Sequence, residues 1–177
     1  RTTKINAEHF QAFASLNYPL LVESGVHLKV MKENLLSRKQ KQHLEVWKDF
    51  ETNVAIIKMF PGITASILNG IFNIPNLKGV VLETYGSGNA PTDAWFVESL
   101  QSAINKGIYI VNVTQCSGGS VMMGKYEASE ALKKMGVIDG KDLTTESAIT
   151  KLMLLLKKNI SHKLFKIKFE ENIAGEI

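Results

Sequence analysis

The feature that most constrains this sequence is an alternation of short apolar runs with amphipathic segments. Runs rich in β-branched residues cover 53–60, 77–85 and 108–115. Segments with apolar residues at helical spacing lie at 64–72, 90–107, 125–136 and 144–159. Nearly continuous apolar strands that alternate with helices are typical of βαβ units. The pattern therefore predicts an α/β fold with a parallel sheet, helices on both faces and right-handed crossovers.

Capping residues mark the ends of the expected helices. Thr92 or Asp93 is expected to cap the start of the second helix, and Gly107 lies beyond its end. Gly136 closes the third helix, and the fourth ends near Asn159. These signals locate the loops between the elements, and binding and catalytic residues are often found on such loops.

The first 50 residues lack this regular pattern. They contain a turn-like Tyr18-Pro19 and a short strand-like piece, and they are otherwise rich in charge and turn residues. We interpret 1–50 as the end of a preceding domain and a linker, and 51–177 as an α/β domain with a C-terminal tail. The chain begins with Arg1 and not with Met, so we expect a fragment. A signal peptide upstream of it would not be seen.

Composition narrows the class of partner. The chain has 177 residues, of which 45% are hydrophobic, and no apolar stretch approaches the roughly 20 residues that span a bilayer. Its net charge is only +4, and we interpret the densest basic patch, 157–168, as a solvated face. Neither a membrane nor a nucleic-acid partner is expected. The single cysteine cannot form an intrachain disulfide.

Two loops at strand ends are the candidate binding region. Gly86-Ser87-Gly88-Asn89 follows the second strand, and Thr114-Gln115-Cys116 ends the third. In parallel sheets ligands bind outside the carboxyl ends of the strands, so both loops are expected at one edge. The glycine loop either cradles a ligand or is only a tight turn, and composition alone favours the turn. It lacks the third glycine of a dinucleotide fingerprint.

Other candidates at this edge have ordinary interpretations. A Cys116 nucleophile would need a base, and the histidines at 9, 27, 43 and 162 are all distant in sequence. We therefore favour Cys116 packed as a small hydrophobe. Glu83 lies inside an apolar run and is expected at a sheet edge or in an ion pair, because an unpaired buried charge is costly. No spacing fits a metal site, and no cofactor is expected.

Several segments together resemble a known family. In chain order they are RTTKINAEHFQAFASLNYPLL (1–21), GVVLETYGSGNAP (79–91), IVNVTQCSGG (110–119) and GKYEASEALKKMGVIDGKDLTTESAITKLMLLL (124–156). They resemble the C-terminal part of bacterial L-asparaginases of the cytosolic type, called type I, over nearly the whole chain. The resemblance implies a three-layer domain with a parallel, four-stranded-type sheet.

The resemblance also implies an activity. Members hydrolyse L-asparagine to L-aspartate and ammonia without a cofactor, in the cytoplasm, as homodimers or homotetramers. Their threonine nucleophile and the second threonine, aspartate and lysine that assist it belong to the N-terminal domain. No catalytic residue is therefore expected in this chain, which should be inactive alone.

Substrate-binding residues are implied on the glycine loop. Asn89 matches the family asparagine that holds the substrate's α-amino group from a neighbouring subunit, with Ser87 and Gly88 beside it. Thr114 and Cys116 match the edge of a regulatory asparagine site in some members, where Glu83 replaces an arginine. An arginine would pair with the effector's carboxylate, whereas Glu83 would repel it. We therefore expect that this protein does not bind the regulatory asparagine as those members do.

Two alternatives remain open. One is the ammonia-releasing subunit of a tRNA-dependent glutamine amidotransferase, which carries an extra N-terminal module. The other is a non-catalytic domain for amino-acid binding or dimerisation, which predicts a gene that begins near Arg1.

Overall fold

A computed structural model describes residues 1–36, 46–124 and 127–177, without the side chains of Glu127 and Ala128. Residues 37–45 belong to the predicted linker, and Lys125 and Tyr126 to the predicted third helix. Those parts of the predictions lie outside the described residues. The described residues test the predicted sheet and helices.

The predicted parallel sheet is confirmed. Its strands are β5 (Val54–Lys58), β6 (Gly79–Thr84), β7 (Tyr109–Thr114) and β8 (Ile138–Asp139). They lie in the order β5-β6-β7-β8, and every neighbouring pair is parallel. The three long strands match the predicted runs. The short fourth strand, β8, was not among them.

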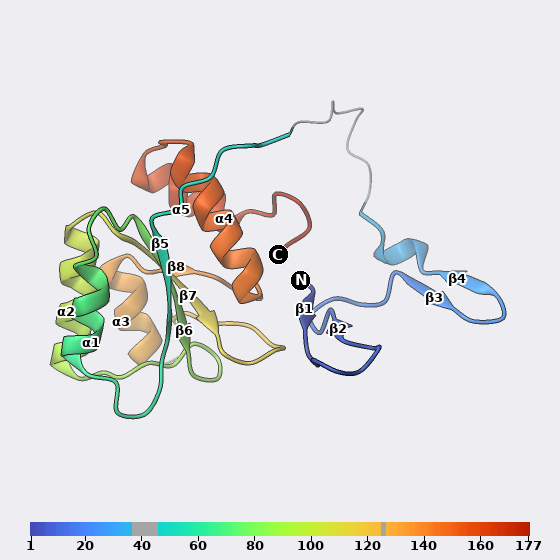
Figure 1. Ribbon diagram of the computed structural model, residues 1–177, viewed down its shortest axis with the longest axis horizontal. Helices are drawn as coiled ribbons and strands as arrows, with labels where there is room; N and C mark the ends of the chain where they lie inside the picture. Colours follow the sequence, from blue (N-terminus) through green and yellow to red (C-terminus); the bar gives the residue numbers. More distant parts are fainter. Residues whose placement is uncertain (37–45, 125–126) are drawn as a thin grey trace.

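Helices cover both faces of the sheet, as predicted. They are α1 (Ala65–Phe72), α2 (Ala94–Asn105), α3 (Glu127–Met135), α4 (Thr145–Lys157) and α5 (His162–Glu170). Figure 1 shows α1, α2 and α3 on one side of the sheet and α4 and α5 on the other. The result is a three-layer α/β domain.

Alternate residues of β6 supply the two halves of the core. Val80 and Leu82 pack in a cluster with the helices α1–α3, whereas Val81 packs with α4 and α5. This division follows from the strand period, which sends successive side chains to opposite faces. All six residues of β6 are buried, which explains why its sequence is an almost unbroken apolar run.

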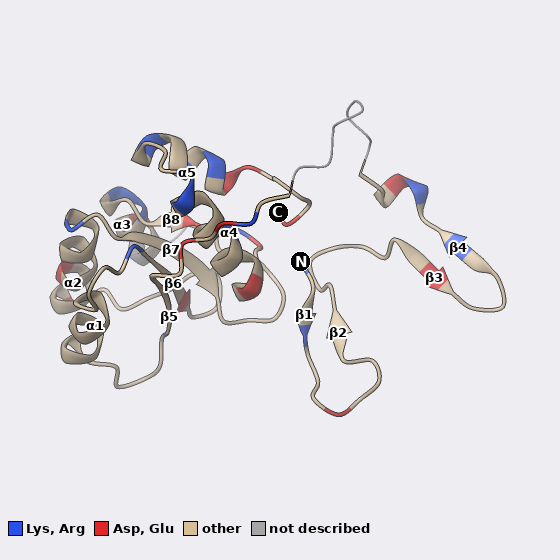
Figure 2. Cartoon of the chain, turned by 45° about the horizontal axis from the view of Figure 1, so that its top comes forward, with Lys and Arg blue, Asp and Glu red and all other residues tan. Residues whose placement is uncertain are grey.

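Helix α5 was not predicted, because the lysines at 163–168 suggested only a solvated face. Ser161 caps the helix by accepting a hydrogen bond from the amide of Leu164. Phe165 and Phe169, one turn apart, are 1% and 0% exposed. Lys163 and Lys168 point to solvent, as expected, and Figure 2 shows the basic residues along this helix.

The caps agree with the sequence only in part. Thr144 caps α4 by accepting a hydrogen bond from the amide of Ser147, and Asn159, at φ 46°, follows its end. Helix α2 begins after Asp93, so Asp93 and not Thr92 is its N-cap. Its carboxylate makes no capping hydrogen bond.

The first 36 residues form two small hairpins, where the sequence predicted one short strand in an irregular region. The hairpins pair β1 (Thr3–Lys4) with β2 (Phe13–Ala14), and β3 (Val22–Ser24) with β4 (Leu28–Val30), before the 3-10 turn η1 (Lys32–Asn34). Figure 1 shows them beside the α/β domain and not within it. Arg1 joins the two parts, since its guanidinium contacts Asp142 at 3.0 Å and the carbonyl of Gly175 at 3.0 Å.

Candidate functional site

The two candidate loops share one edge of the sheet, as predicted. Thr84 at the end of β6 pairs with Thr114 at the end of β7. The hydroxyl of Thr114 donates a hydrogen bond to the carbonyl of Gly86 at 2.5 Å, which joins one loop to the base of the other. The carboxyl ends of parallel strands therefore bring the loop segments together, although about 30 residues separate them in sequence.

The loop from Tyr85 to Asn89 is a tight turn. The amide of Tyr85 donates to the carbonyl of Asn89 at 2.9 Å, and the amide of Asn89 donates back at 2.8 Å. Gly86 and Gly88 have φ of 50° and 102°, a region that side chains other than glycine rarely adopt. A Cβ on Gly88 would lie 2.6 Å from Cγ1 of Val121. The glycines are thus required by the turn and by close packing beneath it.

Three successive carbonyls of this loop are held from outside it. Thr114 binds the carbonyl of Gly86, the amide of Met122 donates to Ser87 at 2.9 Å, and the side-chain amide of Asn112 donates to Gly88 at 3.3 Å. Asn112 is fully buried, and its oxygen accepts a 2.6 Å hydrogen bond from the hydroxyl of Thr84. The loop is consequently fixed on β7 and on the segment after it.

Asn89 lies exposed at the end of this fixed loop. Of the three predicted binding residues, Ser87 is half-buried, Gly88 is buried and Asn89 is exposed. Among the described residues, no hydrogen bond uses the side-chain amide of Asn89, which leaves a donor and an acceptor free for a ligand.

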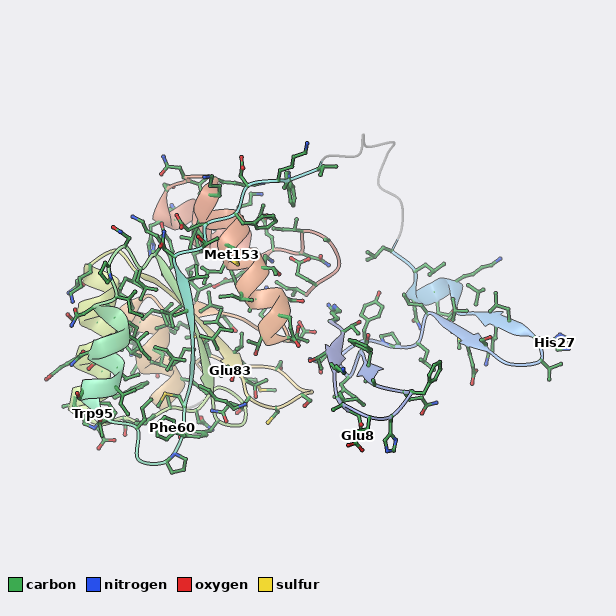
Figure 3. The ribbon with its side chains drawn as sticks, in the orientation of Figure 1. Glu8, His27, Phe60, Glu83, Trp95 and Met153 are labelled. Atoms are coloured by element: carbon green, nitrogen blue, oxygen red, sulfur yellow. The ribbon has the colours of Figure 1, made fainter. Side chains whose placement is uncertain are left out.

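A cavity of about 370 Å³ lies at the end of β7, beside the segment from Thr114 to Ser117. Its lining includes Glu83, Thr114 and Cys116, so the structure also brings together the residues expected at a regulatory edge. Thr3 and Asn17 of the N-terminal hairpin segment and Glu146 of α4 complete part of the wall. In Figure 3 the label of Glu83 marks this edge, on the side that faces the N-terminal hairpins.

Glu83 is paired, which confirms one of the two expected environments. Its carboxylate accepts a hydrogen bond from the hydroxyl of Thr145 at the start of α4 and lies 3.5 Å from the ammonium of Lys58. β6 lies between β5 and β7, so Glu83 is not on an edge strand. Its side chain is only 12% exposed and gives the cavity an acidic wall.

The interpretation of Cys116 as a packed hydrophobe is wrong, because its side chain is exposed. Its backbone amide donates to the hydroxyl of Thr114 at 3.0 Å, and this local bond turns the chain away from the sheet towards solvent. In the described part of the chain no hydrogen bond joins its thiol to a histidine. His162 stacks on Tyr109 at the opposite end of β7, with ring centroids 4.8 Å apart, while His43 lies outside the described residues.

Asn112 and Thr145 were not among the site residues predicted from the sequence. Asn112 could have been found, because an amide inside the apolar strand Tyr109–Thr114 must be hydrogen-bonded if it is buried. Thr145 gave no such signal, since its contact with Glu83 spans 62 positions. Residues 1–36, 46–124 and 127–177 contain no group of three or more acidic, histidine or cysteine side chains placed to hold a metal ion. They also contain no helix long and apolar enough to cross a membrane.

Comparisons with known proteins agree with this architecture. The model of the glutaminase/asparaginase C-terminal domain matches residues 53–169. L-asparaginase 1 of Escherichia coli is 36% identical over all of this chain and 52% of its own length. The 60 kDa lysophospholipase of mouse is 39% identical over 88% of this chain and 27% of its own length. The crystal structure of L-asparaginase I from Vibrio cholerae superposes with a TM-score of 0.89 at 33% identity, over all of this chain and 52% of that one. The chain therefore spans about half the length, or less, of these relatives.

Proposed function

Because this chain belongs to the glutaminase/asparaginase C-terminal domain family, we propose that it is the C-terminal half of an L-asparaginase. The reaction is the hydrolysis of L-asparagine to L-aspartate and ammonia. The identity to an L-asparaginase over the whole chain supports this choice of substrate. The nucleophile belongs to the preceding half, so this chain alone is inactive.

The proposed domain boundary lies near residue 50. Residues 1–50 are the end of the N-terminal domain and the linker, and 51–177 are the C-terminal domain and its tail. The exposed apolar side chains of the hairpins support this division, since Phe10, Val26 and Leu28 are 105%, 96% and 68% exposed. An apolar surface of this kind is expected to pack against another part of the protein.

The loop from Tyr85 to Asn89 is the proposed substrate wall. The observation that carries this proposal is the combination of a fixed backbone with a free amide at its end. The amide oxygen of Asn89 accepts a hydrogen bond from the α-ammonium group of asparagine, while Ser87 and Gly88 shape the surface beside it. A wall that is already rigid requires no reorganisation when the substrate binds.

The loop serves the active site of a neighbouring subunit. The exposure of Asn89 supports this arrangement, because its side-chain amide makes no hydrogen bond within the described part of its own chain. A contribution to a neighbouring active site requires a homodimer or homotetramer. The small-molecule substrate and a location in the cytoplasm are proposed from the resemblance to type I L-asparaginases.

The cavity beside Glu83 does not take the carboxylate of a regulatory asparagine. The cavity lining carries the carboxylates of Glu83 and Glu146 and, among the described residues, no lysine or arginine, although Lys58 lies 3.5 Å from Glu83. A second carboxylate in this space would be repelled. The rate should consequently depend hyperbolically on the asparagine concentration.

Ammonia release by the full-length protein tests the proposal, with L-asparagine and L-glutamine as substrates. We expect hyperbolic turnover of asparagine, and a roughly 10- to 100-fold lower kcat/KM in Asn89→Ala, as for the loss of a hydrogen bond to a charged group. Asn69→Ala, at an exposed position of α1, is the matched control and should retain full activity.

Three results would argue against parts of this proposal. Equal activity of the Asn89→Ala and Asn69→Ala variants would remove the loop from the substrate site. A clearly sigmoidal curve would contradict the conclusion about Glu83. Absence of asparagine turnover would refute the activity itself, and ammonia release from glutamine alone would indicate an amidotransferase subunit.

A further inference from the structure

The hydroxyl of Thr114 connects β7 to the carbonyl of Gly86. It donates to that carbonyl at 2.5 Å and accepts from the amide of Cys116 at 3.0 Å, while the residue is only 8% exposed. Its hydrogen-bonding capacity is thus directed to the two loops and not to solvent. No other described side chain binds the Gly86 carbonyl.

Asn112 holds the same loop two residues earlier on β7. Residues two apart on a strand point to one face, so Asn112 and Thr114 act from the same side. Asn112 takes the carbonyl of Gly88 at 3.3 Å, and Thr84 orients its amide through the bond to its oxygen. The two side chains therefore engage both glycine carbonyls of the turn that carries Asn89.

We infer that Thr114 is a positioning residue, whose hydroxyl, together with the Asn112 amide, holds Asn89 at the place where it meets the substrate. The inference rests on the proposed function of Asn89. Thr114 does not touch the substrate itself. Thr114 affects the position of Asn89 through the backbone of residues 86–88.

The fold does not need this hydroxyl. β6 and β7 are joined by a backbone ladder that runs from Gly79 and Tyr109 to Thr84 and Thr114. Valine has the shape of threonine and is favoured in strands. Gly86 is exposed, so its carbonyl can bind water when the hydroxyl is removed. Thr114→Val should therefore loosen the loop without unfolding the domain.

A double-mutant cycle in the full-length protein tests this with asparagine as substrate. Thr114→Val should lower kcat/KM about three- to tenfold, mainly through KM, as expected for one neutral hydrogen bond. Thr114→Ser keeps the hydroxyl and should stay within about twofold of the wild type by the same reasoning. In the Asn89→Ala background, Thr114→Val should add less than about a twofold loss, because the group it positions is gone. Thr150→Val, whose hydroxyl bonds only to carbonyls of its own helix, is the matched control.

Amide hydrogen exchange of residues 85–89 tests whether Thr114 holds this loop, independently of enzyme activity. Exchange there should be faster in Thr114→Val than in the wild type, Thr114→Ser and Thr150→Val. Unchanged exchange would overturn the inference whether or not asparagine is turned over. Equal losses of kcat/KM from Thr114→Val in both backgrounds, or equal damage from Thr114→Ser, would overturn it as well. Absence of turnover together with faster exchange would refute the asparaginase proposal but leave Thr114 holding the loop.

Discussion

Gly88→Ala is the most direct perturbation of the proposed substrate wall. The backbone at Gly88 has φ 102°, and a Cβ there would lie 2.6 Å from Cγ1 of Val121 and 3.2 Å from Nδ2 of Asn112. Carbon atoms in good contact are about 3.5–4.0 Å apart, so the loop or Val121 must move by about 1 Å. The substitution therefore changes the geometry of the loop and removes no polar group.

The cost of Gly88→Ala has two parts. A side chain in this backbone region costs of order 1–3 kcal/mol, and overpacking against buried neighbours typically costs about 1–3 kcal/mol. Part of this is relieved if the loop shifts, so we expect about 2–4 kcal/mol of lost stability, much of it local to the loop. A 1 Å displacement of a positioning group can lower the rate about 100-fold. We expect a fall in kcat/KM of that order.

The assay is ammonia release by the full-length protein, together with its thermal unfolding. Gly70→Ala is the matched control, because Gly70 lies on α1, is exposed and has no atom within 4 Å of an added Cβ. It should leave activity unchanged and stabilise the helix by about 0.5–1 kcal/mol. Val121→Ala introduced into Gly88→Ala should recover part of the activity, since it removes the closest clash and leaves the backbone strain. Activity of Gly88→Ala within twofold of the wild type would refute the reasoning about the loop.

Two further predictions concern the C-terminal tail and the subunit arrangement. Burial raises the pKa of Glu176, but hydrogen bonds from Lys151 and from the Ile173 and Ala174 amides outweigh it and lower the pKa from 4.5 to about 2. Because the folded-state pKa is the lower one, the full-length protein should lose stability as the pH falls from 4.5 towards 2, by about 1–2 kcal/mol once solvent screening of the pair is allowed for. Denaturant unfolding of Glu176→Gln should show a flatter pH dependence, and an equal dependence would mean that the pair contributes nothing. Subunits of Asn89→Ala mixed with subunits that lack the catalytic threonine should regain activity, since one site of the hybrid then has both groups; no gain would mean that Asn89 serves its own subunit.

The layers of the α/β domain were predictable because they depend on local periodicity. The residues of β6 and β7 are buried on both faces, which produces apolar runs that no solvated strand would show. β8 has only two residues, Ile138 and Asp139, which is too short for any periodic signal. Helix α5 was obscured by its lysines, although Phe165 and Phe169 already had the spacing of a buried helical stripe.

The site was predictable in its location and not in its contacts. The carboxyl-edge rule placed the Tyr85 to Asn89 loop beside Thr114, because it depends only on strand direction. Glu83 contacts Lys58 and Thr145, which lie on elements far apart in sequence. Hydrophobic periodicity carries no information about such pairs. Cys116 was misplaced for the same reason, since whether a strand-end residue packs inward depends on the path of the loop that follows.

The proposed function requires that this edge bind a substrate without transforming it, and the side chains found there agree with that role. The buried polar side chains of the described edge are already engaged: Thr84 with Asn112, Thr114 with Gly86, and Gln115 with the carbonyls of Met59 and Glu83. Threonine hydroxyls and side-chain amides are not bases near neutral pH, so none of these groups can take a proton from a nucleophile. The amide of Asn89 is free, yet an amide neither attacks a carbonyl nor acts as a base near neutral pH. In the proposed function, the hydrogen bonds of this edge hold the loop rigid enough to orient an amino acid, and the chemistry comes from the N-terminal half of an L-asparaginase.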